Sequence, residues 1–500
     1  MMYIYSEGSD VIMKKRIIAG SIALVVLTMA FAGCGAKKNG NEQKVKLDPN
    51  NPVSLTVWHY YNGTQQATFD ELVEEFNKTT GKEKGIYVEG RSQGSVADLE
   101  KAVSSALNEE VGASDLPDIF SSYADTAYSA QKKGKLTDLS KYFTKDELSR
   151  YVDSYVEEGY FNQDDSLYLL PVAKSTEIMM INKTDWEPFA KETGVKLDDL
   201  STIEGVTKVA EKYYEWTDAQ TKDIPNDGKA FYGRDSMSNY FIIGMKQMGK
   251  EIFEVKDGKV TFHTDKNLIH RLWENYYVPY MKGYFAAYGK FRSDDVKIGD
   301  ILAYTGSTSS AFYFPDNVEK EDGSYPIDFI VRKAPIMEGG EAYKVQQGAG
   351  MAVTKSDEEH EYAACEFLKW FTKKEQNLQF VCQSAYLPVL KEANNINSLD
   401  SIIKEKDIQM NKKAYSCLET VLNDFDDSKF YTTKNFENGF QARKVLDYNL
   451  SDQIQEDKKA MDEAIKAGAS REEELKKYTS EESFEAWYQE FCKALSDSVK

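Results

Sequence analysis

The sequence predicts an α/β fold, because short β-branched or aromatic runs alternate with amphipathic helical patterns early in the folded region. The expected order is strand 54–61, helix 69–76, strand 86–88, helix 99–107 and strand 117–122. Apolar residues recur every three or four positions in the helices, whereas the strands are short β-branched or aromatic runs. This alternation favours a mostly parallel sheet flanked by helices.

Helical patterns also dominate the end of the chain. Two helices are expected over 356–371 and 372–381, and alternating charges extend over the last fifty residues. Apolar side chains recur within those charges at Leu475, Phe484, Trp487, Phe491 and Leu495. We expect these residues to pack the last helices onto the body of the protein, with the charges facing solvent.

Size and charge limit the class of protein. The 500 residues, 41% of them hydrophobic, can form more than one core, since single cores stop growing at roughly 250–300 residues. The 62 basic and 82 acidic residues give a formal charge of −20, which argues against nucleic acid or an anionic membrane as the main partner. The 32 tyrosines fit either half-buried packing or the binding of flat, half-polar ligands.

Cysteine and histidine usage gives no sign of a metal site or another cofactor. The five cysteines show no C-x-x-C spacing, and the four histidines are scattered along the chain. We therefore expect no cofactor. One or two disulfides remain open among Cys365, Cys382, Cys417 and Cys492.

The N-terminal residues have the layout of a secretory signal, with Met13 as the expected start. Basic residues at 14–16 precede an apolar run at 17–32 and then Gly33-Cys34. Residues 31–34 resemble a bacterial lipobox, which implies removal of residues 1–33 and lipidation of Cys34. Residues 34–52 are expected to form a flexible tether. The alternative is an uncleaved anchor, although the run is shorter than the ~20 residues of a spanning helix.

Four segments, in order, carry a resemblance to a known family. They are 55–60, then 116–120 with 134–139, then 168–172 with 180–183, and finally 346–353 with 363–371 and 386–389. Together, behind a lipobox-like Cys34, they resemble the extracellular solute-binding protein family 1, the maltose-binding-protein-like receptors of ABC importers. The resemblance extends from Val53 to about Leu450.

The resemblance implies a two-lobed periplasmic-binding-protein-like fold whose lobes are joined by crossing strands. Lobe 1 would comprise 53–174 plus 350–397, and lobe 2 would comprise 178–345 plus 398–500. The implied protein is not an enzyme. It is a monomeric lipoprotein on the extracellular face of the cell membrane, which closes around a mono- or oligosaccharide and delivers it to the permease of an ABC importer.

Candidate ligand-binding residues follow from a general rule that ligands of open α/β sheets bind beyond the carboxyl ends of the strands. The first lobe supplies Trp58, His59, Tyr60, Tyr61, Tyr123 and Asp125. The first crossing would add Lys174, Ser175 and Thr176, and the second lobe Ser307, Thr308, Ser309 and Tyr313, with Gln346, Tyr431 and Phe436 as further candidates. Aromatic rings beside polar groups suit sugars, and the resemblance places Asp125 where family members bind sugar hydroxyls.

Several of these residues also have a purely structural interpretation. Trp58 can face the core, Asp125 can cap the helix that follows it, and the Ser/Thr turn can be an ordinary loop. His59 fits a satisfied structural histidine better than a ligand or a base.

Three alternatives stay open. The same receptor could take an anionic solute, such as a sugar phosphate or a uronate, held by Lys174 and the Ser/Thr turn. Residues 90–94 match G-x-S-x-G, so Ser92 could be the nucleophile of an extracellular esterase. A surface adhesin or a sensor partner is the third possibility.

Overall fold

The computed structural model describes residues 45–161, 165–256, 258–321 and 323–500. The expected signal peptide and Cys34 lie outside these residues. The chain divides into a unit of residues 1–46 and a unit of residues 47–500, and the description below concerns the second unit. Within the described ranges, no helix combines the length and the apolar character that crossing a membrane would require.

The first sheet forms around the predicted opening strand. Its strand order is β2 (Ile86–Ser92), β1 (Val53–His59), β3 (Ile119–Ser122), β14 (Gly350–Val353) and β4 (Leu170–Pro171). β1 pairs in parallel with β2 and β3, whereas β14 runs antiparallel to β3 and β4. Helices α2 (Gly63–Lys78), α14 (Glu358–Phe371) and α15 (Lys374–Ser384) cover one face, where Phe69 packs edge-on against Phe371.

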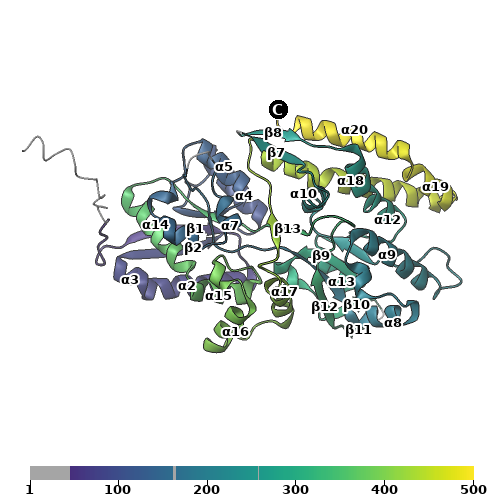
Figure 1. Cartoon of the computed structure of the whole chain (residues 1–500), viewed down its shortest axis with the longest axis horizontal. Helices are drawn as coiled ribbons and strands as arrows, with labels where there is room; N and C mark the ends of the chain where they lie inside the picture. Colours follow the sequence, from purple (N-terminus) through teal and green to yellow (C-terminus); the bar gives the residue numbers. More distant parts are fainter. Residues whose placement is uncertain (1–44, 162–164, 257, 322) are drawn as a thin grey trace, which may run out of the picture. The chain divides into compact units, whose positions relative to one another are not determined.

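A second sheet forms the core of the other half of the unit. Its strand order is β12 (Phe329–Lys333), β5 (Glu177–Asn182), β9 (Ala303–Ser307) and β6 (Tyr232–Arg234). β6 and β9 are parallel, but β5 runs antiparallel to both β12 and β9. The predicted α/β fold with two sheets is confirmed, but both sheets are mixed rather than mostly parallel. Figure 1 shows β1, β2 and α14 on one side, β9 and β12 on the other, and β13 (Tyr343–Val345) between them.

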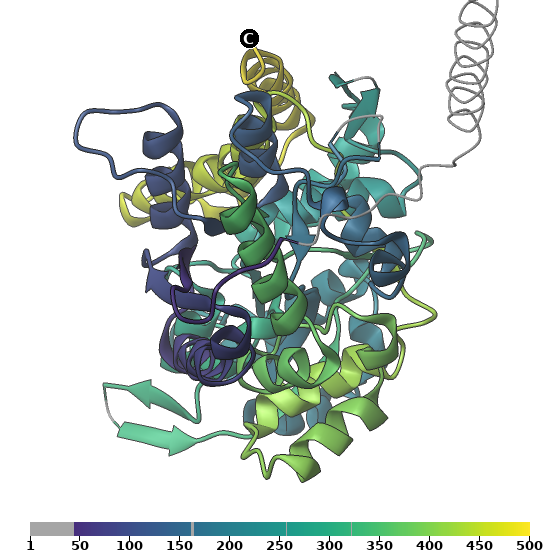
Figure 2. The ribbon, with the colours of Figure 1, turned by 90° about the vertical axis from the view of Figure 1, so that its left-hand side faces the viewer.

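Three two-stranded sheets complete the strands. They are β7 (Phe253–Lys256) with β8 (Lys259–Phe262), β10 (Asn317–Lys320) with β11 (Gly323–Pro326), and β13 with β15 (Lys429–Tyr431). The β10–β11 hairpin projects from the rest of the fold in Figure 2. The parallel pairing of β13 with β15 brings a late segment beside the segment that returns to the first sheet.

The remaining helices connect and cover the two sheets. They are α3 (Thr80–Lys84), α4 (Val96–Leu107), α5 (Ala124–Lys132), α6 (Lys145–Ser149), α7 (Asp153–Glu157), α8 (Lys183–Thr193), α9 (Ile203–Asp218), α10 (Met237–Gln247), α11 (Lys266–Glu274), α12 (Tyr277–Met281), α13 (Arg292–Ile298), α16 (Ile396–Glu405), α17 (Lys412–Leu422), α18 (Gly439–Lys466), α19 (Arg471–Tyr478) and α20 (Glu481–Asp497). Short 3₁₀ turns, η1 (Leu139–Lys141), η2 (Leu197–Leu200), η3 (Thr308–Tyr313) and η4 (Lys391–Ala393), lie between them.

Two crossing segments run between the halves and pair with each other. The Ser175 N–H donates to the Gln347 carbonyl at 2.8 Å, and the Gln347 N–H donates back at 3.1 Å. Beside this pair, Lys174 is 1% exposed, and its Nζ donates to Glu158 Oε2 at 2.7 Å and to the Gly348 carbonyl at 2.6 Å. Gly348 has φ +96°, and a side chain there would crowd the first crossing.

A second buried network holds the same crossing on the side of the second sheet. Arg234 Nη2 donates to Glu177 Oε2 at 2.8 Å. Asn239 Nδ2 contacts both Glu177 Oε1, at 3.0 Å, and Gln347 Oε1, at 2.8 Å. Asn239 therefore joins the two crossing segments through side chains alone.

The C-terminal helices pack on the cluster of buried residues around the second sheet. Phe484, Trp487, Phe491 and Leu495 are buried, and Leu475 packs against the same cluster. Phe491 stacks on Phe241 of α10 with ring centroids 5.3 Å apart. The last helices are therefore structural parts of the second half rather than an appendage.

Removing one of these rings tests that conclusion. We expect Phe491→Ala to lower the free energy of unfolding by about 3–5 kcal/mol, because the substitution leaves a cavity in a filled core. Urea unfolding followed by circular dichroism measures the loss. Tyr448→Ala on α18 is the control, since Tyr448 is 58% exposed; equal losses in the two variants would contradict the assignment.

The buried ammonium of Lys174 gives a second prediction. Lys174→Met leaves the Glu158 carboxylate buried without its cation, and we expect a loss of about 3–5 kcal/mol of unfolding free energy. Lys145→Met is a matched control, because the Lys145–Asp165 pair is 91% exposed on both sides and exposed pairs contribute about 0–1 kcal/mol. A loss in Lys174→Met no larger than that of the control would show that the pair is dispensable.

Candidate functional site

Three tyrosines gather where β1 and β3 end. Tyr60 follows β1, Tyr123 follows β3, and Tyr386 follows α15; the Tyr60 and Tyr386 hydroxyls lie 3.3 Å apart. Burial raises the pKa of each phenol well above its ordinary value, and Tyr60 also raises the pKa of Tyr123. The hydroxyls are therefore neutral groups that can donate and accept hydrogen bonds.

Charged residues from both halves meet beside these rings. Asp125, in the first turn of α5, lies 3.8 Å from Nε of Arg443 on α18. Glu100 of α4 interacts electrostatically with Asp125, Arg443 and Lys444. We call Glu100, Tyr123, Asp125, Arg443 and Lys444 the inter-half cluster.

Burial governs the protonation of the two carboxyl groups in the inter-half cluster. It raises the pKa of Glu100 to about 7, and the neighbouring Asp125 adds to this rise while Lys444 and Arg443 oppose it. Burial also raises the pKa of Asp125, against the opposing effect of Arg443. The cluster therefore contains a carboxyl group that changes protonation near neutral pH.

A glycine allows α18 to reach the first half. A Cβ on Gly439 would lie 2.8 Å from Asp125 Oδ1, so a larger residue there would displace the Asp125 carboxyl group. A second contact between the halves joins the exposed Tyr313 Oη to Asn62 Oδ1 at 3.2 Å. The two halves therefore face each other at the carboxyl ends of β1 and β3.

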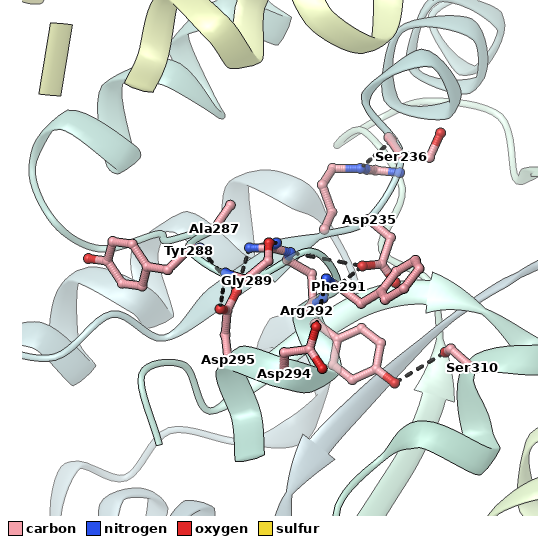
Figure 3. A network of polar contacts seen from close by, with 12 residues as sticks. Asp235, Ser236, Ala287, Tyr288, Gly289, Phe291, Arg292, Asp294, Asp295 and Ser310 are labelled. Carbon is pink, nitrogen blue, oxygen red and sulfur yellow. Dashed lines mark hydrogen bonds and ion pairs between the residues drawn. The ribbon is translucent and has the colours of Figure 1, made fainter. Parts of the chain in front are cut away.

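A mostly buried polar network lies near the end of β9 in the second half. The Arg292 N–H donates to Asp235 Oδ1 at 2.9 Å, and a Cβ on Gly306 would lie 2.4 Å from Asp235 Oδ2. Burial raises the pKa of Asp235 to about 6. In Figure 3, Asp235, Phe291 and Ser310 lie on one side of the Arg292 side chain, and Tyr288 lies on the other.

The loop before α13 is fixed by a fully buried carboxylate. Asp295 accepts from the Gly289 N–H at 2.6 Å and pairs with Arg292, whose Nη2 donates to the Gly289 carbonyl at 2.5 Å (Figure 3). Phe291, which follows Gly289 closely, is 52% exposed. The hydrogen bonds at Gly289 therefore fix the backbone of a loop whose Phe291 ring is exposed to solvent.

The predicted Ser/Thr turn is bonded mainly to itself. Ser307 Oγ and Ser309 Oγ lie 2.9 Å apart, and Ser310 Oγ donates to the Ser307 carbonyl at 2.6 Å. Thr308 is fully buried, and its Oγ1 has no partner among the described residues. The hydroxyls of Ser307 and Ser309 remain partly accessible.

Several predicted residues lie in the core or the crossing instead of at a solute surface. His59 and Tyr61 pack their rings against Phe69, and Phe436 packs against Phe253 and Phe262. Lys174 is bound by Glu158 and by the Gly348 carbonyl. The physical reason is burial: these side chains are at most 2% exposed, so we leave them out of the proposed site.

Other predicted residues border these positions. Trp58 is 7% exposed and points to the face opposite His59, since side chains alternate along a strand. Ser175 and Thr176 are buried in the crossing. Gln346 Nε2 donates to Glu158 Oε2 at 2.7 Å, which makes Gln346 part of the Lys174 network.

Tyr431 and Gln346 line a separate open hollow of about 1020 Å³. Its walls come from both halves, with Tyr128, Ser154 and Phe161 on one side and Lys246 and Glu251 on the other. The Tyr431 ring lies under Lys246 Nζ at 4.5 Å. Tyr431 therefore belongs to this hollow and not to the inter-half cluster.

Sequence reasoning missed Glu100, Tyr386, Arg443 and Lys444. Tyr386 stood inside a segment that carried the family resemblance, but it follows helix α15, so the rule about strand ends does not select it. Glu100, Arg443 and Lys444 sit in amphipathic helices among many other charges, and no local pattern distinguishes them. The packing of α4 and α18 against α5 brings them together.

The esterase alternative is contradicted by the geometry around Ser92. Ser92 is the last residue of β2 rather than part of a sharp turn, and α4 begins only at Val96. Its Oγ donates to the Tyr61 carbonyl at 2.9 Å. His59 Nε2 has no hydrogen-bond partner in the described part of the chain, and burial lowers the pKa of His59 to about 4. A serine nucleophile activated by a base is absent from this position.

Cysteines and acidic residues give no further chemistry in the described residues. Cys365, Cys382, Cys417 and Cys492 are free thiols, so the disulfides left open by the sequence do not form in this structure. Across the described ranges, no three His, Cys, Asp or Glu side chains are grouped in a way that could hold a metal ion.

Comparison with curated proteins identifies the family. A family model for bacterial extracellular solute-binding proteins matches residues 71–414. The arabinooligosaccharide-binding protein of Bacillus subtilis is 24% identical over 266 residues, which cover 51% of this chain and 53% of that protein. The chain thus matches about half the length of this curated relative.

Solved structures show the same fold. The cyclic alpha-maltosyl-1,6-maltose binding protein of Arthrobacter globiformis aligns with a TM-score of 0.61 at 18% identity, over 90% of this chain and 99% of that one. UgpB of Mycobacterium tuberculosis, in complex with glycerophosphocholine, aligns with a TM-score of 0.62 at 17% identity, over 89% and 100%. This chain belongs to the bacterial extracellular solute-binding proteins, a family of non-catalytic receptors.

Proposed function

We propose that this receptor binds a neutral carbohydrate, a mono- or oligosaccharide, between its two halves. The observation that carries the proposal is the inter-half cluster, in which the Tyr123 ring lies near the carboxyl groups of Glu100 and Asp125 and the Arg443 side chain, with the Tyr60 and Tyr386 rings beside it. Rings can lie under the apolar C–H face of a sugar, and carboxylates accept protons from its hydroxyls. The curated relative that binds arabinooligosaccharide supports the same class of ligand.

The charges near the cluster favour a neutral ligand over an anionic one. Lys174, which the sequence suggested as the partner of an anionic solute, is neutralised by Glu158. Arg443 already faces Asp125. Glu100 adds a further acidic group beside Asp125 and Arg443. An anionic solute would have to compete with these carboxylates for the same cations.

Delivery to a membrane importer completes the proposed role. We infer that halves of residues 53–174 plus 350–397 and 178–345 plus 398–500 close over the solute through the crossing segments. We also propose that the chain acts as a monomer, anchored by lipid on Cys34 outside the cell membrane, and hands its ligand to the permease of an ABC importer.

A thermal-shift screen tests the ligand class. We expect stabilisation by a neutral oligosaccharide, by about 2.7 kcal/mol at a hundred times its Kd, and none by sugar phosphates or uronates at equal concentration. Stabilisation by the anionic compounds alone would reverse the assignment.

Substitution of Asp125 tests the location of the site. We expect Asp125→Asn to weaken carbohydrate binding by about tenfold to a hundredfold, because a hydrogen bond to a charged group contributes about 1.5–3 kcal/mol. Calorimetric titration measures the change in Kd. Asp165→Asn makes the same substitution at a carboxylate that is 91% exposed and should bind normally; if both variants bind like the parent, the site lies elsewhere.

The raised pKa of Glu100 predicts a pH dependence of stability. Because the pKa of this carboxyl rises from 4.5 to about 7 on folding, the folded protein binds more protons than the unfolded chain between these pH values. The contribution of Glu100 is complete below about pH 4.5 and is lost as the pH rises to about 7.

Glu100→Gln should therefore flatten the decline in unfolding free energy between pH 5 and pH 7.5, as measured by urea titration. A residual slope is expected, because the raised pKa values of Asp125 and Asp235 act in the same direction. Glu473→Gln, at an exposed position of α19, should keep the full decline. If the unfolding free energy of Glu100→Gln declines with pH as steeply as that of the parent, the Glu100 carboxyl does not cause the pH dependence.

A further inference from the structure

A cavity of about 450 Å³ lies beside the crossing segments, within the second half. Its lining begins at Thr176 and includes none of the residues before it, so the tyrosines and carboxyl groups of the first half do not reach it. The accessible surface of its wall is mainly apolar, with Ile178, Ile203, Ile243, Val331, Val345 and Val421 among the lining residues, although Arg332, Lys333, Lys344 and Asp424 also line it. The cavity is therefore separate from the inter-half cluster.

One end of the cavity carries a buried guanidinium with an unused donor. Arg234 is 7% exposed; its Nε donates to the Ser236 carbonyl at 3.0 Å and its Nη2 to Glu177 at 2.8 Å. Nη1 has no hydrogen-bond acceptor within the described parts of the chain. Thr176 also lines the cavity, is 1% exposed and has an unpartnered Oγ1.

Unpartnered buried polar groups are costly, so most buried donors in folded proteins are paired with protein, water or ligand. The positive charge of Arg234 is already balanced by Glu177, which removes the attraction for an anion. Lys333 and Lys344 of the lining are likewise paired, both with Asp424. The cavity therefore offers a hydrogen-bond donor beside a mainly apolar wall, in a space large enough for a small organic molecule.

We propose that this cavity is a second binding site, for a neutral and mainly apolar small molecule that carries one hydrogen-bond acceptor, such as an amide carbonyl. The carbonyl would accept from Arg234 Nη1, and the apolar part would lie against the aliphatic wall. The site is independent of the carbohydrate, and its test does not require the proposed function to hold.

Acetanilide is a suitable probe, because it combines one benzene ring with one amide carbonyl and has no charge. We expect saturable one-site binding to the purified protein, with a Kd on the order of 1 mM, by saturation-transfer NMR titration. N-ethylaniline, which replaces the carbonyl with a methylene, should bind about tenfold more weakly. Equal binding of the two probes would overturn the role of the Arg234 donor.

Two variants fill the cavity from its edge. Val331→Trp on β12 and Ala334→Phe after it, both at half-buried lining positions, should each weaken acetanilide binding at least tenfold. Ile330→Trp places the same ring on the opposite face of the same strand and should change the Kd less than twofold. Circular dichroism of each variant checks that the fold is kept. Two filling variants are used so that the test remains possible if one of them does not fold.

Three results would overturn the proposal. They are the absence of saturable acetanilide binding to the parent protein, unchanged binding in both filled variants, and displacement of acetanilide by a carbohydrate that stabilises the protein. The last of these would place the probe in the carbohydrate site. Failure of the carbohydrate screen alone leaves the second site standing.

Discussion

The buried ammonium of Lys174 is the interaction on which the arrangement of the two halves depends. It joins α7, through Glu158, to the Gly348 carbonyl of the returning segment. Both charges are almost completely buried, at 2% and 8% side-chain exposure, so each needs the other to offset its desolvation. Such a pair specifies one register of the crossing segments, because a shift by one residue would leave two buried charges unpaired.

Two side-chain networks hold the crossing segments, one on the side of each sheet. Lys174, Glu158 and Gln346 hold the crossing to α7, while Glu177, Arg234 and Asn239 hold it to α10. The paired backbone between them has only a few hydrogen bonds, from Ser175 and Gln347. The crossing is therefore held by side chains on both sides of a short backbone ladder.

Much of the fold was predictable because its signals are local. Strand 54–61 and the helices after it follow from alternation of short apolar runs, and the rule about strand ends correctly brought Tyr60, Tyr123 and Asp125 to one edge. The direction in which each side chain points was harder to predict from the sequence. His59 and Tyr61 lie in the same short run as Tyr60, yet they face Phe69, and the aromatic run itself does not show which of its faces is covered.

The charged part of the site was beyond local patterns for a different reason. Lys174 looked available for an anion, but its partner Glu158 lies sixteen residues earlier and the Gly348 carbonyl 174 residues later. Arg443 meets Asp125 across more than three hundred positions. Contacts of this kind depend on the packing of whole helices, so a sequence read by itself offers candidates for charge pairs without showing which of them form.

The C-terminal helices connect stability to the site. α18 carries Arg443 and Lys444 at its beginning and is braced further along by α20, where Trp487 Nε1 donates to Asn449 Oδ1 at 2.8 Å. α20 in turn is fixed to α10 by the stacking of Phe491 on Phe241. Since α10 also supplies Asn239 to the crossing network, the position of Arg443 and the geometry of the crossing are set by the same packed helices. Residues of the second core thus determine how Arg443 meets Asp125.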